Sequence, residues 1–386
     1  MKYYLIAGEA SGDLHGSNLI KGLSTQDPGA EFRFWGGDLM SAAAGQSGNL
    51  VKHYNEGAVM GVSDVLAKAG KLLGNVKFCK QDILSWKPDV VILIDYPGFN
   101  FKIAEFAHKR GFRVFYYIAP KTWASRESRN RKLKKFVDKL FIIFPFEKDY
   151  FNSRGISFEY CGNPLIDAVA NSPALMESKA GFLDRNKIEE KRYVALLAGS
   201  RKGEIKRMMP VYMKFADRLR KYDGFGDMEF IIAGAPSRST GDYTGFIEGR
   251  PYVHLVFNET YGVLKNAEAA VINSGTASLE AALIGTPQVV GWTSTKLTGF
   301  VARKILKVQN HIKFISLGNL IVDRLVFKEF YMDGFTVENI TDEILHILND
   351  NSYRAGMIEG YNEIRSLLGE SGASRQIADR MIRSLR

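Results

Sequence analysis

Residues 3–13 decide the fold of this chain; they read Tyr3-Tyr4-Leu5-Ile6-Ala7-Gly8-Glu9-Ala10-Ser11-Gly12-Asp13. The apolar residues that begin this stretch predict a short buried strand, and a turn of small residues with a carboxylate follows it. Apolar side chains then recur at the spacing of a helix, at Leu14, Leu19, Ile20 and Leu23. A strand, a glycine-rich turn and a helix place the turn at the carboxyl edge of a parallel sheet, where open α/β folds bind their ligands.

The turn does not carry either of two common nucleotide signatures. Its glycines, at positions 8, 12 and 16, do not make the GxGxxG pattern, and the chain has no GxxxxGK[ST]. Glu9 would repel a pyrophosphate placed directly over it. We therefore expect Glu9 and its neighbour Ser11 to face the hydroxyl groups of an acceptor.

Length and composition set the class of protein. The 386 residues predict about two domains, and 46% hydrophobic with 24% charged residues is ordinary for a globular chain. The longest apolar runs, such as 90–94, are too short to span a bilayer, and the chain opens on a strand rather than on a signal peptide. Two cysteines without CxxC spacing fit a reducing cytosol, so we expect a cytoplasmic protein.

The formal charge of +10 predicts an acidic partner: nucleic acid, anionic lipid or a phosphorylated small molecule. The positive charge is concentrated at residues 126–135. This run is either the solvated face of a helix or a surface that meets anionic lipid. No helix-turn-helix, RRM or zinc-finger pattern accompanies it, so we expect no nucleic-acid partner.

Strand and helix patterns alternate in both halves of the chain, which predicts right-handed βαβ units and parallel sheets. In the first half the expected strands are 3–7, 31–35, 89–94, 113–118 and 139–144, and the expected helices are 13–25, 62–85, 100–109 and 125–136. In the second half the expected strands are 192–198, 228–233, 253–256, 269–272 and 287–290, and the expected helices are 203–221, 260–267, 276–284 and 296–307.

A polar stretch at 171–191 separates the two series. We therefore expect an α/β protein of the GT-B type, with two Rossmann-like domains facing each other across a cleft; some epimerases share this architecture. The expected domains are 1–170 for the acceptor and 171–359 for the UDP-sugar. Helices at 360–386 either complete the first domain or exchange with a second subunit in a homodimer.

Asp95 ends a buried apolar run, 90–94, and Pro97-Gly98 turns the chain just beyond it. A carboxylate at the end of a strand can accept the proton of an attacking hydroxyl, which is the role of general base in an inverting transfer. Asp95 can equally cap the next helix or pair with an arginine or lysine. From these residues alone the alternatives stay open.

Two turns in the second half predict a site for a diphosphate. Gly199-Ser200-Arg201 joins a strand to a helix, so backbone N–H groups and a guanidinium can stabilise the charge of a UDP leaving group. Ser274-Gly275-Thr276 repeats this arrangement, and Glu280 can accept both ribose hydroxyls. Alternatively, the first turn is an ordinary exposed loop, Ser274 caps the helix, and Glu280 only favours its first turns. Because no DxD motif and no cluster of His or Cys ligands occurs, we expect no metal or other cofactor.

These strings together resemble the lipid-A-disaccharide synthases, a family of inverting GT-B glycosyltransferases. The likeness rests on AGEASGD at 7–13, IDxPxFN at 94–100, SGTxxLE at 274–280, YIAPKTWA at 117–124, VMG at 59–61 and SLGNLI at 316–321. Two positions depart from the family pattern. Gly318 replaces a proline, which we expect to loosen the loop that presents Asn319, and Ser125 replaces a second tryptophan.

The resemblance implies that the donor is UDP-2,3-diacylglucosamine and the acceptor 2,3-diacylglucosamine 1-phosphate, joined into a β(1→6) disaccharide of lipopolysaccharide biosynthesis. It implies that Asp95 is the base, that Glu9 orients the acceptor or supports Asp95, and that Asn319 has a donor-site or catalytic role. Contacts to the acceptor and its lipid are expected at Ser11, Met60, Pro97 and Asn100.

Residues 60–78 predict an amphipathic helix in which lysines interrupt an apolar stripe. Such a helix either packs on the core of its own protein or lies in the headgroups of an anionic membrane. Because the implied substrates carry acyl chains, the resemblance favours peripheral association with the cytoplasmic face of the inner membrane.

Overall fold

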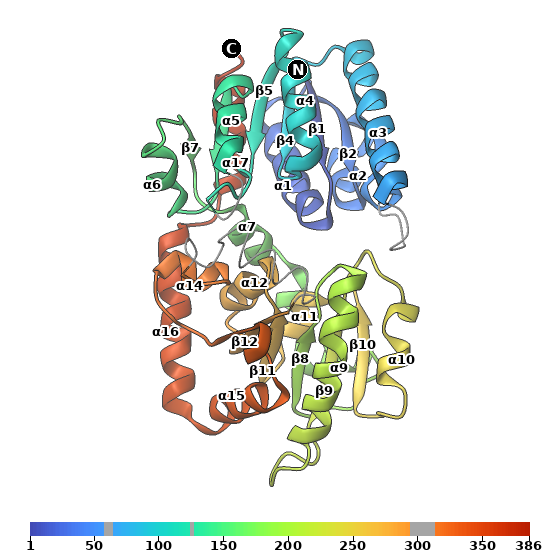
Figure 1. Ribbon diagram of the computed structural model, residues 1–386, viewed down its shortest axis with the longest axis vertical. Coiled ribbons are helices and arrows are strands. Elements are labelled where there is room, and N and C mark those ends of the chain that lie inside the picture. The colour runs from blue at the N-terminus through green and yellow to red at the C-terminus, as the bar shows by residue number, and fades with distance from the viewer. Residues whose placement is uncertain (58–64, 124–126, 294–312) are drawn as a thin grey trace. The chain divides into compact units, whose positions relative to one another are not determined.

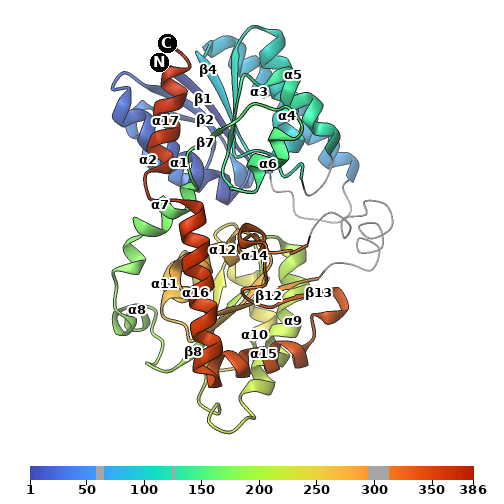
Figure 2. The same cartoon turned by 90° about the vertical axis from the view of Figure 1, so that its left-hand side faces the viewer.

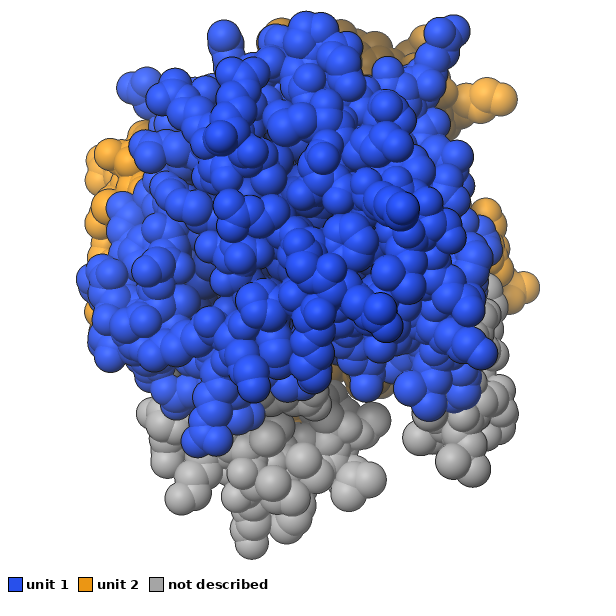
Figure 3. Space-filling view, turned by 90° about the horizontal axis from the view of Figure 1, so that it is seen from above, with its two compact units in different colours: residues 1–168, 369–386 blue, residues 169–368 orange. Residues whose placement is uncertain are grey.

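Among the residues described by the computed structural model, which are 1–57, 65–123, 127–293 and 313–386, the chain folds around two parallel sheets (Figure 1). Each sheet belongs to one unit. Unit 1 is Met1–Ala168 together with Gly369–Arg386, and unit 2 is Val169–Leu368; Figure 3 gives each unit its own colour.

The sheet of unit 1 has the strand order β3-β2-β1-β4-β5-β6-β7, and all neighbours are parallel. Its strands are β1 (Lys2–Ala7), β2 (Glu31–Gly36), β3 (Gly48–His53), β4 (Val90–Ile94), β5 (Arg113–Tyr117), β6 (Lys139–Ile142) and β7 (Glu159–Tyr160). The central strand β4 is buried along its whole length because helices cover both faces of a parallel sheet. The order reverses between β1 and β4.

Helices cover the two faces of this sheet in two groups (Figure 2). One face carries α1 (Ala10–Gln26), α2 (Asp38–Ala44) and α17 (Ala373–Arg383), and the other carries α3 (Val65–Trp86), α4 (Pro97–Lys109) and α5 (Asn130–Phe136). The short helices α6 (Glu147–Asn152) and α7 (Pro164–Ala170) follow. An apolar core that includes Ile83, Leu93 and Ala104 lies under the second group.

Asp167 fixes the return of the chain to unit 1. Its carboxylate accepts hydrogen bonds from Ser371 Oγ at 3.0 Å and from the backbone N–H of Ser374 at 2.8 Å, at the start of α17. Helix α17 then packs against α1. We expected helices at 360–386 either to complete the first domain or to exchange with a second subunit. In the structure α16 (Asn351–Leu368) continues to the end of unit 2, and Gly369–Arg386 belongs to unit 1.

The sheet of unit 2 repeats the order of the first sheet with six strands in place of seven, β10-β9-β8-β11-β12-β13, again with parallel neighbours. Its strands are β8 (Tyr193–Leu197), β9 (Glu229–Gly234), β10 (Val253–Phe257), β11 (Ala269–Asn273), β12 (Gln288–Trp292) and β13 (Glu329–Tyr331). The order reverses between β8 and β11, which corresponds to the reversal between β1 and β4.

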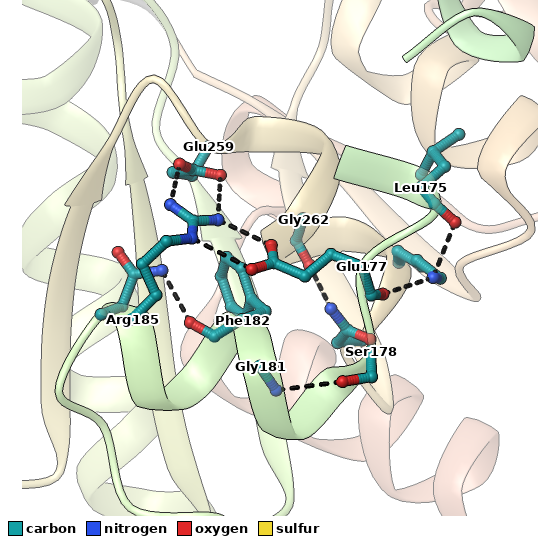
Figure 4. A network of polar contacts seen from close by, with 11 residues as sticks. Leu175, Glu177, Ser178, Gly181, Phe182, Arg185, Glu259 and Gly262 are labelled. Carbon is teal, nitrogen blue, oxygen red and sulfur yellow. Dashed lines mark hydrogen bonds and ion pairs between the residues drawn. The ribbon is translucent and has the colours of Figure 1, made fainter. Parts of the chain in front are cut away.

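The helices of unit 2 are α8 (Lys179–Arg185), α9 (Lys202–Leu219), α10 (Thr244–Ile247), α11 (Thr260–Lys265), α12 (Thr276–Ile284), α14 (Leu317–Val322), α15 (Val337–Asn349) and α16. Helices α9 and α15 pack together, as do α11 and α12. An ion-pair network fastens α8 to the start of α11: Arg185 donates to Glu177 at 2.7 Å and to Glu259 at 2.5 Å (Figure 4).

The predicted α/β fold with two Rossmann-like domains is confirmed, and so are the strands that flank both reversals. Three strands were not predicted: β3, β7 and β13. Strand β3 has no buried residue and lacks an apolar run, and β7 and β13 are only two and three residues long. Helix α4 begins at Pro97, ahead of the predicted residue 100, because proline suits the first helical position. The predicted helix 296–307 lies outside the described residues.

None of the helices in the described part of the chain has the length and apolarity that a membrane crossing requires.

Candidate active site at the two sheet reversals

In each unit the reversal of strand order brings two turns together at the carboxyl edge of the sheet, which is where open α/β folds bind ligands. In unit 1, β1 and β4 are paired neighbours, so the turn after Ala7 lies beside the turn after Ile94. In unit 2, β8 and β11 are paired neighbours, so the turn after Leu197 lies beside the turn after Asn273. These are the turns that the sequence motifs predicted.

Glu9 occupies the N-cap position of α1, and its backbone carbonyl accepts the N–H of Asp13 at 3.0 Å. The side chains of Glu9 and Ser11 are exposed at the edge of the sheet. Both residues thus stand where an acceptor could reach them, and the contact itself stays a prediction.

Asp95 and Tyr96 both adopt the left-handed backbone conformation, with φ of 43° and 45°. Two adjacent residues other than glycine rarely do so, because each conformation costs roughly 1–3 kcal/mol. Hydrogen bonds hold the turn in place: the carbonyl of Asp95 accepts from Tyr116 Oη at 2.6 Å and from Asn100 Nδ2 at 2.8 Å. The N-cap of α4 is Tyr96 rather than Asp95. The half-buried carboxylate of Asp95 is therefore placed by a strained and well-supported turn.

The predicted acceptor residues beyond this turn have different surroundings. Pro97 is the first residue of α4 and is half-buried. Asn100 is completely buried, and its amide also donates to the carbonyl of Ile94 at 3.3 Å. Asn100 thus supports the backbone of Asp95. Met60 lies outside the described residues.

Asp13, which belongs to the first motif, was not predicted as a functional side chain. Its buried carboxylate accepts backbone N–H groups from Gly37 at 2.7 Å, Leu39 at 3.1 Å and Met40 at 3.1 Å, at the start of α2. Burial raises the pKa of Asp13 and these bonds lower it, with burial the larger effect. Asp13 therefore anchors the turn that carries Glu9 to the neighbouring βα connection.

Glu147 is a second buried carboxylate that sequence reasoning missed. It accepts the N–H groups of Ile143 at 3.1 Å and Phe144 at 3.0 Å, and the indole N–H of Trp123 at 3.1 Å. Burial raises the pKa of Glu147 to about 7, opposed by these bonds and by Lys121. Glu147 follows the end of β6 by five residues and is the first residue of α6, and an acidic residue in the first turn of a helix is the available local signal. Its contact with the tryptophan of the YIAPKTWA string could not be predicted.

In unit 2, Gly199 takes the left-handed conformation with φ of 94°. The carboxylate of Glu204 folds back over this turn and accepts the N–H groups of Ser200 at 3.1 Å and Arg201 at 3.2 Å, while Arg201 Nη1 donates to it at 3.1 Å. A carboxylate of the chain therefore occupies the backbone donors that we expected to face a diphosphate. The side chain of Arg201 remains 65% exposed.

Hydrogen bonds from Ser274 to two neighbouring segments hold the second turn of unit 2. Ser274 donates its backbone N–H to the carbonyl of Gly291 at 2.8 Å and its hydroxyl to the carbonyl of Ile315 at 3.0 Å. The N-cap of α12 is Gly275, so the interpretation of Ser274 as the helix cap is wrong. Gly275 is exposed and Thr276 half-buried, which leaves the start of α12 accessible. Helix starts of this kind suit anions.

Glu280 lies one turn further along α12 and is half-buried. It accepts a hydrogen bond from Tyr261 Oη at 2.9 Å. Burial raises the pKa of Glu280, and the bond from Tyr261 lowers it. Tyr261 was not predicted, because its partner lies on another helix. A carboxylate held in this way can accept hydroxyl groups, as the ribose assignment requires.

Asn319 is fully buried, and its amide is saturated by internal bonds. Nδ2 donates to the carbonyl of Phe327 at 2.9 Å and to Glu329 Oε1 at 2.8 Å, and Oδ1 accepts the N–H of Val326 at 2.8 Å. Glu329 also accepts the N–H of Ile315 at 2.7 Å. Through Glu329, Asn319 thus helps to hold the segment at Ile315, whose carbonyl accepts the hydroxyl of Ser274.

Gly318 does not loosen this segment. It lies inside α14, where a side chain would meet the ring of Phe327 at 2.9 Å and Ile364 at 3.2 Å. Ser125, the other departure, lies outside the described residues.

For two basic segments, residues 126–135 and 60–78, the sequence allowed either packing on the protein itself or contact with an anionic membrane. In α5, Leu133 and Phe136 are buried, while the basic residues of the helix are exposed: Arg131, Lys132, Lys134 and Lys135. In α3, Val76 and Ile83 are buried in the core, but Leu73 and Phe78 are 59% and 46% exposed.

Within the described residues, no three His, Cys, Asp or Glu side chains gather where they could hold a metal ion.

Known proteins resemble this chain over nearly its whole length. A family model described as Lipid-A-disaccharide synthetase matches residues 3–377. The lipid-A-disaccharide synthase of Geobacter metallireducens is 35% identical over 376 residues, covering 97% of this chain and 94% of the relative. That of Myxococcus xanthus is 34% identical over 383 residues, covering 99% and 97%.

Solved structures resemble the fold. The S. aureus MnaA–UDP co-structure has a TM-score of 0.70 at 15% identity and covers 100% of this chain and 96% of its own. Methanocaldococcus jannaschii UDP-GlcNAc 2-epimerase, in complex with UDP-GlcNAc and UDP, has a TM-score of 0.68 at 15% identity and covers 99% and 100%. At this identity the likeness concerns the fold alone.

Proposed function

The chain belongs to the lipid-A-disaccharide synthase family of glycosyltransferases, and we propose that it transfers 2,3-diacylglucosamine from UDP-2,3-diacylglucosamine to 2,3-diacylglucosamine 1-phosphate. The 6-hydroxyl of the acceptor attacks C1 of the donor, and the products are a β(1→6) lipid A disaccharide and UDP. In this proposal unit 1 binds the acceptor and unit 2 binds the UDP-sugar. The observation that carries it is the strained turn at Asp95, a carboxylate placed at the reversal of the first sheet.

In the proposed mechanism Asp95 takes the proton of the 6-hydroxyl as its oxygen attacks. The bond from that oxygen to C1 forms while the bond from C1 to the diphosphate breaks, so the α-linked donor gives a β-linked product. General-base help of this kind contributes about 10²–10⁴ in rate. Glu9, on the paired turn, orients the acceptor. The hydrogen bonds from Tyr116 and Asn100 to the carbonyl of Asp95 support this role, because they fix the base before the substrate arrives.

The departing UDP gains negative charge, and unit 2 offers the groups that would stabilise it. We assign the diphosphate to the start of α12, at Ser274–Thr276, and to the guanidinium of Arg201. Glu280 accepts the ribose hydroxyls. Because Glu204 holds the N–H groups of Ser200 and Arg201, the turn at Gly199 contributes mainly by aiming Arg201. Asn319 acts as a positioning residue beneath Ser274.

We also propose that the protein works at the cytoplasmic face of the inner membrane as a peripheral protein, since both substrates carry two acyl chains. The net charge of +10 supports attraction to an anionic surface. The exposed Leu73 and Phe78 of α3 support contact with acyl chains. A homodimer remains a prediction that a mass measurement in solution would test.

The test is UDP release by the purified protein with both diacylated substrates in detergent micelles, with and without EDTA. We expect UDP and a new disaccharide in equal amounts, with EDTA making no difference. Release that stops with EDTA would contradict the metal-independent leaving-group model. Turnover of plain UDP-GlcNAc without UDP from the acylated donor would contradict the substrate assignment and favour an epimerase.

A further inference from the structure

The ring of Tyr96 packs directly on Gly8, and no side chain could be added to Gly8 without displacing it. A Cβ built on Gly8 would lie 2.5 and 2.6 Å from Cδ1 and Cδ2 of the Tyr96 ring. Gly8 is not among the glycines with positive φ. The position therefore needs glycine for space and not for backbone conformation.

Tyr96 is held in place by more than this contact. Its ring stacks on Phe99, with ring centres 5.4 Å apart and planes at 19°. Its carbonyl accepts the N–H groups of Phe99 at 3.2 Å and Asn100 at 3.0 Å. These contacts fix a residue whose own φ is 45°, directly after Asp95. The packing of the ring and the strained backbone of Asp95 are thus parts of one turn.

The ring also lies near Glu9. The pKa of the Tyr96 hydroxyl is raised by burial and, to a smaller extent, by the negative charge of Glu9. The packing contact of Tyr96 with the turn after β1 is therefore at Gly8, and the charge of Glu9 on the same turn also acts on the Tyr96 hydroxyl. In the family pattern IDxPxFN, position 96 is one of the two that the pattern leaves open.

We propose that Tyr96 is a positioning residue that, together with Gly8, locks the turn carrying Glu9 onto the turn carrying Asp95. The pair fixes how far apart the two carboxylates stand, and so fixes the acceptor hydroxyl relative to its base. The proposal rests on the function proposed above, in which Asp95 is the base. It assigns the positioning of the two turns to the ring of Tyr96 and not to its hydroxyl.

The test compares Gly8→Ala, Tyr96→Ala, the double variant and Tyr96→Phe by kcat, by KM for the UDP-sugar and by thermal unfolding. We expect Gly8→Ala to lower kcat about 100-fold and Tyr96→Ala about 10-fold, since misplacement by about 1 Å can cost 10² in rate. The KM for the UDP-sugar should not change. The double variant should recover to the level of Tyr96→Ala, because removing the ring makes room for the new methyl group. Tyr96→Phe should match the wild type.

Gly98→Ala is the matched control on the same turn. Gly98 is exposed, and apart from its chain neighbours and the nearby backbone of α4, no described atom lies within 4 Å of a Cβ built there. We expect this variant to keep the wild-type kcat and melting temperature. An equal loss in Gly98→Ala and Gly8→Ala would show that any added methyl group disturbs the turn, and would overturn the proposal.

Other outcomes would also overturn it. A double variant no better than Gly8→Ala would show that Gly8 does not act through Tyr96, and an equal loss in Tyr96→Phe and Tyr96→Ala would assign the effect to the hydroxyl. If Gly8→Ala does not fold, the comparison of Tyr96→Ala with Tyr96→Phe still tests whether the ring of Tyr96 positions the turn. In an Asp95→Asn background, Tyr96→Ala should cost nothing further in kcat. Should Asp95→Asn remain active, the base role fails. The packing of the pair is still tested, because we expect the clash with the Tyr96 ring to lower the melting temperature of Gly8→Ala and the double variant to recover it.

Discussion

The two sheet reversals have the same strand topology and solve opposite chemical problems. At the reversal of unit 1 the left-handed positions are Asp95 and Tyr96, which are not glycine. At the reversal of unit 2 the left-handed position is Gly199. Where a side chain must be aimed, the chain accepts backbone strain; where the backbone itself must come close to a ligand or a capping group, it uses glycine.

The difference extends to the charges. Carboxylates gather at the edge of unit 1, with Glu9 and Asp95 on paired turns. At the edge of unit 2, backbone N–H groups and Arg201 predominate, and Glu204 already engages two of those N–H groups. One edge can take up a proton and the other can hold negative charge. Transfer of a sugar from a nucleotide to a hydroxyl requires both, which is why a repeated fold with divergent turns suits the reaction.

Asp95→Asn should have the largest effect, because it removes the proposed base and keeps its shape. We expect kcat to fall by about 10²–10⁴, the usual contribution of a general base, with the affinity for UDP unchanged. UDP release and calorimetric titration with UDP measure the two quantities. Near-normal turnover would remove Asp95 from the mechanism.

Asp95→Gly is the control that separates strain from chemistry. It also removes the carboxylate, but it makes the turn resemble that at Gly199. We expect the same loss of kcat, with a free energy of unfolding that is unchanged or higher by about 1 kcal/mol, because glycine tolerates φ of 43°. A marked loss of stability would show that the turn is not strained, and would break the comparison between the two reversals.

Glu280→Gln should have the next largest effect, on the side of unit 2. Hydrogen bonds to charged groups contribute about 1.5–3 kcal/mol, so we expect the affinity for UDP to fall about 10- to 100-fold. Titration with UDP measures it, and uridine without the diphosphate should lose affinity to the same extent. Tyr261→Phe is the matched control: it removes the partner of Glu280 and should cost less. Unchanged affinity in Glu280→Gln would contradict the ribose assignment.

Arg201→Ala should have a smaller effect, because a side chain that is 65% exposed interacts through water. We expect the affinity for UDP to fall about 3- to 10-fold, and the loss to shrink at high salt. Lys202→Ala is the control, since it removes a neighbouring charge that pairs with Asp242 at 3.5 Å. Equal losses in the two variants would show that the site responds to net charge and not to the aimed guanidinium.

The sequence sufficed to predict the turns at both reversals, and the reason is local. The runs before Gly8, Asp95, Gly199 and Asn273 are wholly apolar and are followed by small or polar residues, so both the strand and its end can be read within ten residues. The edge strand β3 carries no such run, and none of its residues is buried. The fold class therefore followed from the ten predicted strands and from their alternation with helices.

What could not be predicted depends on partners far apart in the sequence. Asp167 caps a helix more than 200 residues later, and Glu280 receives its bond from a different helix. Glu204 is only four residues from Ser200, but whether its carboxylate or a ligand takes the N–H groups is not visible in a motif. Asn319 could be expected near the donor, but its complete burial among Phe327, Val326 and Glu329 follows from tertiary packing.

Substitution of Glu147 should have the smallest effect on the reaction. Its effect is expected in the pH dependence of stability, which tests the charge state of a buried carboxylate at the edge of unit 1. Burial raises its pKa from 4.5 to about 7 in the folded protein. Between these values the folded chain binds more protons than the unfolded chain, so this group makes stability fall as the pH rises from about 4.5 to about 7 and has no further effect above that.

Glu147→Gln removes the titrating group and should flatten the stability curve across this window. The measurement is the free energy of unfolding by urea at steps from pH 4.5 to 8, for the wild type and the variant. Glu159→Gln is the matched control, since Glu159 lies in the same unit but stays partly exposed and pairs with Lys139 at 3.3 Å. If the curves of wild type and Glu147→Gln run parallel, Glu147 is not protonated near neutral pH. The edge of unit 1 would then hold its buried carboxylate as an anion, secured by the N–H groups of Ile143, Phe144 and Trp123 alone.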